Sequence, residues 1–199
     1  MKVLGINSSA RKDGNTAILM KKVFEALNKE GIETEMIQLS GKIIEPCKAC
    51  FACGGKRNCV HKKDPFQNIF EKMTQADGII LGSPVYTANI SANMQALLER
   101  ASVVTDMNRE ENLFQHKVGA AITAARRGGA LHALDAMNHF FMLQNMFIAG
   151  STYWPMAYGR MPGDVQKDEE GLATMSSLGQ NMAYLLISLN TAERHKGIL

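Results

Sequence analysis

The sequence lacks any apolar run that approaches the roughly 20 residues of a membrane span, and its 199 residues carry a net charge of only +3. Lysines and arginines are scattered among the acidic residues, so neither nucleic acid nor a membrane is expected as a partner. The first apolar run, residues 3–7, is far too short for the hydrophobic region of a secretory signal. We therefore expect a cytoplasmic protein.

Cysteine is absent outside one short stretch. All four cysteines lie between positions 47 and 59. In a reducing cytosol, cysteines serve more often as metal ligands or redox groups than as partners in structural disulfides. This stretch is therefore a candidate metal site.

Short apolar segments alternate with amphipathic segments along the chain, which predicts an α/β fold. Strands are expected over residues 3–7, 33–39, 78–82, 118–123 and 146–149. Helices are expected over residues 16–30, 65–75, 91–104, 130–145 and 170–191. This alternation predicts one flavodoxin-like domain over residues 1–199, a doubly wound five-stranded parallel sheet with strand order 2-1-3-4-5. A cysteine-rich loop, residues 41–64, is inserted after the second strand.

Ligands of such sheets bind beyond the carboxyl ends of the strands, where loops 8–16, 84–91 and 124–130 should meet. The first loop reads Ser-Ser-Ala-Arg-Lys-Asp-Gly-Asn-Thr, which is neither GxGxxG nor a Walker A loop. Hydroxyls and backbone N–H groups at a helix N-terminus suit a monophosphate. The expected phosphate contacts are Ser9, Arg11, Asn15 and Thr16. The alternative is a tight turn in which Asn15 or Thr16 only caps the helix.

These four residues match the Ser-x-Arg-x-x-x-Asn-Thr loop of the NADPH-dependent FMN reductases, which the sequence thus resembles. The resemblance implies FMN as cofactor and a second loop that wraps the flavin ring. That loop supplies Pro84, Val85, Tyr86, Thr87 and Asn89. The third loop adds Arg127, which is either a flavin contact or merely solvated, and Gly128, where a flavin can approach the backbone closely.

The cysteines have the spacing C-x2-C-x2-C-x5-C. Three cysteines at this spacing resemble the compact ferredoxin motif that wraps an iron–sulfur cluster. Zinc is the alternative metal, but zinc sites more often combine one CxxC pair with a distant second pair, so the spacing favours an iron–sulfur cluster. The predicted metal ligands are Cys47, Cys50, Cys53 and Cys59, with His61 as a candidate neighbour of the site.

Together, the cysteine motif and the flavin loops resemble the iron–sulfur flavoprotein family of anaerobic archaea and bacteria over roughly residues 1–125. The resemblance implies a [4Fe–4S] cluster, FMN, a homodimer or homotetramer, and electron transfer from a ferredoxin-like donor. No residue stands out as a catalytic acid or base. Because the cysteine loop follows an edge strand, we expect the cluster to face the flavin of a partner chain at least as closely as its own.

Two other functions fit the same residues. One is an NAD(P)H-dependent FMN or quinone reductase without a cluster, whose cysteines hold zinc or nothing. The other is a flavodoxin-like module that binds a partner and contains a structural zinc.

Overall fold

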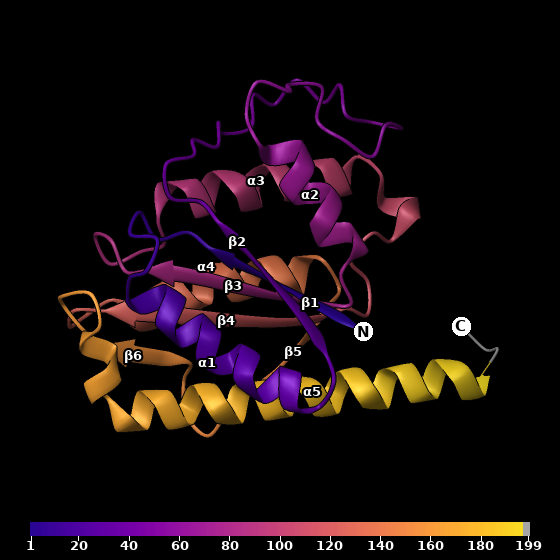
Figure 1. Cartoon of the computed structure of the whole chain (residues 1–199). Coiled ribbons are helices and arrows are strands. Elements are labelled where there is room, and N and C mark those ends of the chain that lie inside the picture. Colours follow the sequence, from indigo (N-terminus) through magenta and orange to yellow (C-terminus); the bar gives the residue numbers. More distant parts are fainter. Residues whose placement is uncertain (197–199) are drawn as a thin grey trace.

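A computed structural model describes residues 1–196 of the chain, and side chains as far as Thr191 (Figure 1). The strands are β1 Lys2–Asn7, β2 Glu33–Gln38, β3 Gly78–Pro84, β4 Val118–Ala125, β5 Phe147–Ile148 and β6 Met156–Tyr158. The α-helices are α1 Asn15–Lys29, α2 Phe66–Gln75, α3 Ala92–Asp106, α4 Ala130–Leu143 and α5 Glu169–Lys196. Two short 3₁₀ helices are η1 Arg109–Glu111 and η2 Asp164–Lys167.

The strands form a parallel sheet in the order β2-β1-β3-β4-β5, which confirms the predicted flavodoxin-like order. The last position differs from the prediction because two short strands share it. β5 pairs only with Val118 and Gly119 of β4, whereas β6 pairs with Thr123–Ala125. The stretch between the predicted fifth strand and the last predicted helix, for which no strand was expected, therefore contains a further strand, which returns to the same edge of β4.

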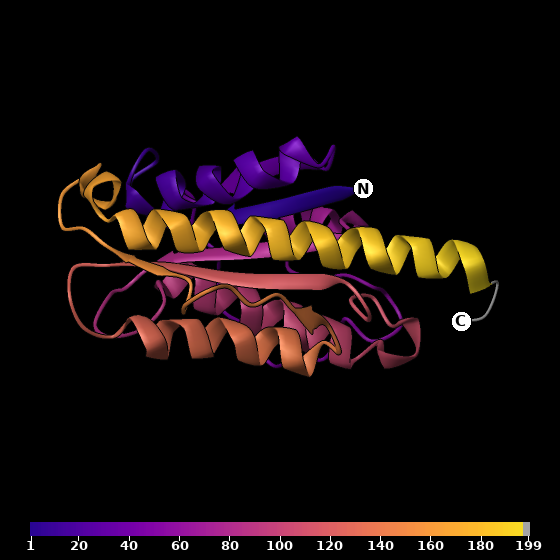
Figure 2. The same ribbon diagram turned by 90° about the horizontal axis from the view of Figure 1, so that it is seen from below.

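Helices cover both faces of the sheet. Figure 1 shows α1 and α5 on one side, and α2, α3 and the cysteine-containing loop on the other. The buried residues form two cores that follow this division: Leu4 and Leu81 pack toward α2, α3 and α4, whereas Val3 and Ile80 pack toward α1 and α5. Figure 2, in which the molecule is seen from below, shows α5 running along one side of the sheet and α4 along the opposite side.

Small residues and caps set where the helices begin and end. Gly31 follows α1 with a φ of +72°, the left-handed conformation in which a glycine commonly ends a helix. Ser91 accepts a hydrogen bond from the N–H of Met94 and caps α3. A Cβ on Gly82 would lie 3.1 Å from Cγ2 of Thr16. The glycine thus lets the first turn of α1 lie close to the end of β3.

All five helices are present, and each differs from its predicted range by one or more residues. α2 starts at Phe66, one residue after the expected position, and Asp64 accepts a hydrogen bond from the Phe66 N–H at 3.2 Å. α5 continues past position 191 to Lys196. No helix within residues 1–196 has both the length and the hydropathy needed to cross a bilayer.

Candidate cofactor sites

Side chains at the ends of two strands hold the first loop. The Asn7 Oδ1 accepts a hydrogen bond from the Ser9 N–H at 3.0 Å, and the Gln38 Nε2 donates to the Ser9 carbonyl at 2.7 Å. Asn7 also donates to Gln38 at 2.6 Å, so β1 and β2 fix the loop jointly. Sequence reasoning missed both residues. Their position at the carboxyl ends of strands was the available signal.

The start of α1 fits an anionic group. Its N-cap, Gly14, provides no side-chain cap, and the first turn contains no acidic residue, so its N–H groups suit an anion. The Thr16 hydroxyl is buried and has no hydrogen-bond partner within the described residues. Ser9 is also buried, and its hydroxyl accepts from the Arg11 N–H at 3.1 Å. An unpaired buried hydroxyl is costly, and a phosphate oxygen would satisfy it.

The segment between β6 and η2, residues 159–163, lies against the first loop. The amide of Asn15 donates to the Met161 carbonyl at 3.0 Å and accepts from the Gly163 N–H at 2.9 Å. The Arg11 guanidinium reaches the Arg160 carbonyl at 3.4 Å. Asn15, a predicted phosphate contact, therefore holds this segment, which sequence reasoning missed.

Asp164 fixes the turn of that segment. Its carboxylate accepts hydrogen bonds from the N–H groups of Met161 at 2.7 Å and Arg160 at 3.2 Å. The pKa of Asp164 is lowered chiefly by the hydrogen bond from Met161, and also by the nearby Lys167 ammonium and the hydrogen bond from Arg160. The charged form of Asp164 thus holds residues 159–163 in a turn beside the first loop.

The second loop forms a tight turn at the end of β3. Tyr86 and Asn89 exchange two backbone hydrogen bonds, of 2.8 and 3.0 Å. Between them, Thr87 and Ala88 have φ angles of 49° and 59°, a conformation that costs energy for residues other than glycine. Tyr86 is 45% exposed. The turn therefore presents an aromatic ring at the sheet edge at some cost in strain, which is typical of functional sites.

The third loop packs on the second through Gly129. This glycine has a φ of +90°, and a Cβ there would lie 2.7 Å from Cα of Ala88. Its neighbour Gly128 has open space, with no atom within 4 Å of an added Cβ, and Arg127 is exposed. Pro84 pairs with Ala124 in the sheet. The structure thus brings the second and third loops together, and it assigns the strict glycine requirement to Gly129, which was not predicted as a site residue.

The first loop joins the same edge. The Ser8 N–H donates to the Gly82 carbonyl at 2.9 Å, and the Val85 N–H donates to the Ala124 carbonyl at 2.9 Å. All three predicted loops therefore meet at the carboxyl edge of β1, β3 and β4, as expected for this fold.

The four cysteines line one cavity between the cysteine-containing loop and α3. All four are free thiols. Cys53 is 6% exposed, and burial, together with the other three thiols, raises the pKa of its thiol. The cavity measures about 20 Å³, which is room for about one water. A larger group therefore requires outward movement of the exposed part of the loop around Cys50.

Among the side chains that the structure describes, residues 1–191, no three or more of His, Cys, Asp or Glu are grouped so that they could hold a metal ion. The four thiols nevertheless line the same cavity. The thiolate is the form of cysteine that binds metals. In an iron–sulfur cluster each thiolate binds a different iron. The donor set of four free cysteines around one cavity thus fits a cluster in kind.

Polar side chains of α3 and its neighbours hold the cysteine loop. The Glu99 carboxylate accepts from the Cys47 N–H at 3.1 Å, and the Asn108 amide donates to the Cys53 carbonyl at 3.1 Å. The His61 Nε2 lies 3.6 Å from the Cys50 sulfur, so this predicted neighbour does touch the site. Glu99 and Asn108 were not predicted, because no local pattern links them to cysteines some 50 positions away.

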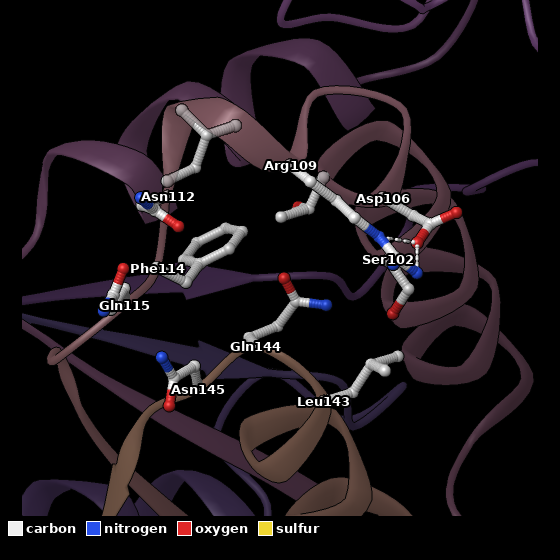
Figure 3. A pocket seen from close by; sticks show the side chains of 11 residues that line it. Ser102, Asp106, Arg109, Asn112, Phe114, Gln115, Leu143, Gln144 and Asn145 are labelled. Carbon is white, nitrogen blue, oxygen red and sulfur yellow. Dashed lines mark hydrogen bonds and ion pairs between the residues drawn. The ribbon is translucent and has the colours of Figure 1, made fainter.

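A separate hollow of about 380 Å³ lies between the ends of α3 and α4 (Figure 3). It contains a hydrogen bond of 2.6 Å from Arg109 to Asp106. These helix ends lie at the amino edge of β4, opposite the three loops. The hollow includes none of the predicted site residues and plays no part in the proposed chemistry.

Comparison with known proteins agrees with this geometry. A family model described as NADPH-dependent FMN reductase matches residues 1–160. The chain belongs to this family. Within it, an iron-sulfur flavoprotein of Methanocaldococcus jannaschii is 37% identical over 190 residues, which cover 92% of this chain and 96% of that protein. An iron-sulfur flavoprotein of Methanosarcina thermophila is 30% identical over 189 residues, 94% and 95% of the two chains.

Solved structures support the fold. RosB, whose structure contains 8-demethyl-8-formylriboflavin-5'-phosphate, superposes with a TM-score of 0.76 at 18% identity, over 96% of this chain and 81% of that chain. An archaeal flavodoxin superposes with a TM-score of 0.59 at 13% identity, over 94% and 99% of the two chains. The family model and the sequence relatives, not these structures, show that the chain is an iron–sulfur flavoprotein and an FMN redox protein. Its family implies FMN and an iron–sulfur cluster as cofactors.

Proposed function

We propose that this oxidoreductase transfers electrons between a ferredoxin-like donor, a [4Fe–4S] cluster and FMN, and from there to an acceptor. The observation that carries the proposal is that one chain combines four free cysteines around a single cavity with an uncapped, hydroxyl-rich helix start. The cysteines Cys47, Cys50, Cys53 and Cys59 would ligate the cluster.

The three loops would divide the work of holding FMN. The start of α1, with Ser9 and Thr16, suits the phosphate, because its N–H groups and the unpaired hydroxyl favour an anion. The turn at Tyr86 and the open space at Gly128 suit the flavin ring. When bound, FMN exchanges one or two electrons and the cluster exchanges one.

The position of the cavity supports transfer between chains. Glu99 and Val104 bound the stretch of α3 beneath the cysteines. At 1.5 Å per residue, this stretch lies roughly 10 to 18 Å along α3 from the flavin loop. Because the cysteine loop also follows β2, an edge strand that can face another subunit, we expect a homodimer or homotetramer in which the cluster serves a flavin of a partner chain. The exposed aromatic side chains of Phe147 and Trp154 are consistent with such contacts.

The surface around the cysteines suits an acidic one-electron donor. It contains an exposed Phe51 and the basic residues Lys48, Lys56, Arg57, Lys62 and Lys63, of which Lys48 pairs with Glu45 and Arg57 with Glu111. Positive charge around an apolar centre speeds encounter with an acidic protein. A reducing compartment such as the cytoplasm suits the four free thiols.

Anaerobic rapid-mixing kinetics test the proposal. A reduced ferredoxin should reduce the flavin of the wild-type protein much faster than that of Cys53→Ser, while NADPH should be a poor donor to both. Fast reduction by NADPH that is unchanged by Cys53→Ser would instead indicate a cluster-independent FMN reductase.

Mixed oligomers test transfer between chains. A flavin-loop variant, Arg11→Ala with Thr16→Val, and the Cys53→Ser variant should each be inactive alone, and subunit exchange should restore electron transfer. Full activity in a strictly monomeric protein would contradict the inter-chain route.

A further inference from the structure

A buried ion pair lies beneath the cysteine loop. Arg100 of α3 is only 2% exposed, and its guanidinium pairs with the carboxylate of Asp64. The guanidinium also lies 4.1 Å from the ring centre of Phe66. Removing two charges from water carries a large desolvation cost, so a buried ion pair is by itself weak evidence that the pair stabilises the fold. Its location therefore calls for another explanation.

The pair joins the two ends of the cysteine-containing segment. The Arg100 guanidinium donates to the carbonyl of Glu45 at 3.1 Å and to the carbonyl of His61 at 3.0 Å. Asp64 accepts from the Glu45 N–H at 2.7 Å. Glu45 lies two residues before the first cysteine, and His61 lies two residues after the last. The rigid fork of one arginine thus closes the segment that holds all four thiols.

The two charges do not face the thiols equally. Arg100 lines the cysteine cavity, whereas its lining does not include Asp64. A cluster bound by four thiolates is anionic, and reduction adds a further negative charge. A buried cation nearby stabilises the reduced form, because electrostatic interactions are strong where water is excluded, and local charge and hydrogen bonding set cluster potentials.

We propose that Arg100, oriented by Asp64, is the positioning residue of the cluster: it closes the cysteine segment and raises the reduction potential. This inference rests on the proposed function, since it requires the cluster. Removal of each charge should move the potential in opposite directions. Asp64→Asn leaves the cation less neutralised and should raise the potential, whereas Arg100→Met should lower it. Arg100→Lys keeps the charge without the fork and should lie nearer to wild type.

The experiment is an anaerobic redox titration of the full chain, with iron, sulfide and FMN contents measured for each variant. The matched control is Lys72→Met with Glu35→Gln, which removes a partly exposed ion pair between α2 and β2. At a fixed ambient potential, Arg100→Met should lower the ratio of reduced to oxidised cluster at least tenfold, which equals about 59 mV for a one-electron couple. Asp64→Asn should raise this ratio, and the control should leave it unchanged.

Failure to retain the cluster is also informative. Loss of iron from Arg100→Met, with wild-type FMN content and circular dichroism, supports the loop-closing role, and Asp64→Asn then reports on the potential. Wild-type iron content and midpoint potential in both variants would overturn the inference. Equal loss of iron in the control would overturn it too. Wild-type protein without iron and sulfide would instead refute the proposed function.

Discussion

The two cofactor loops of this protein are held in different ways. The first loop, the candidate phosphate site, is short, and the ends of β1 and the edge strand β2 fix it through Asn7 and Gln38. The cysteine-containing segment between β2 and α2 has neither helix nor strand. Glu99 of α3 and Asn108, which follows α3, are among the side chains that hold it.

This difference teaches that one site belongs to the sheet and the other is an addition to it. Backbone that ends a buried strand keeps its position without ligand, because the sheet fixes it. A long irregular segment has many alternative conformations and depends on its anchors and its cofactor. The two sites should therefore fail independently.

The largest effect should follow from loss of one thiolate. Cys53→Ser should abolish the bound cluster, because the chain has no spare cysteine to replace the ligand. FMN content should stay at the wild-type level, since the flavin loops are separate segments. Visible absorption and iron content measure both outcomes. Ala52→Ser, in the same loop, should retain the cluster. Joint loss of FMN and cluster would show that the sites are not independent.

The converse variant should release flavin and keep iron. Arg11→Ala with Thr16→Val removes two of the predicted phosphate contacts, each with an expected contribution of about 1–3 kcal/mol. Flavin titration followed by fluorescence should show weaker FMN binding by that amount. Thr174→Val, a buried threonine of α5, provides the control. Unchanged FMN affinity in the double variant would remove the phosphate assignment.

Two adjacent glycines separate packing from binding. Gly129→Ala forces a Cβ against Ala88 at a φ of +90° and should lower the free energy of unfolding by about 1–3 kcal/mol. Gly128→Ala meets no protein atom, so it should preserve stability and weaken FMN binding only. Chemical denaturation and FMN titration check the pair. Equal effects on stability would contradict the distinct roles.

The smallest effect concerns an ion pair remote from both sites. Hydrogen bonds from Lys2 and Lys72 lower the pKa of Glu35, and the one from Lys2 has the larger effect. The pairing therefore stabilises the fold above the pKa of a free glutamate, about 4.3, and this contribution disappears as pH falls through the lowered pKa. Glu35→Gln should cost no more than about 1 kcal/mol near neutral pH and nothing in strong acid. Denaturation curves at several pH values test this, and a cost that persists in acid would contradict it.

The regular elements were accessible from the sequence because their patterns are local. Apolar runs and amphipathic periods located five strands and five helices, and the parallel order followed from their alternation. The division of the last sheet position between β5 and β6 was not accessible. β6 has only three residues, and its pairing with β4 depends on a return of the chain that no periodicity records.

The sites divide along the same line. Motif spacing singled out the cysteines and the first loop as candidate sites, because those residues are close in sequence. The residues that hold them come from distant segments: Arg100 contacts carbonyls of the cysteine segment, and Asn15 contacts residues 161 and 163. Such contacts arise only when the helices are packed on the sheet, so no single-sequence pattern reveals them.

The most direct test of the central claim, that one chain holds FMN and an iron–sulfur cluster at separate sites, is a cofactor analysis of anaerobically purified wild-type protein. Visible absorption together with iron, sulfide, zinc and flavin content should show FMN and a four-iron, four-sulfide cluster in equal amounts per chain. Zinc in place of iron, or a colourless protein, would contradict the claim.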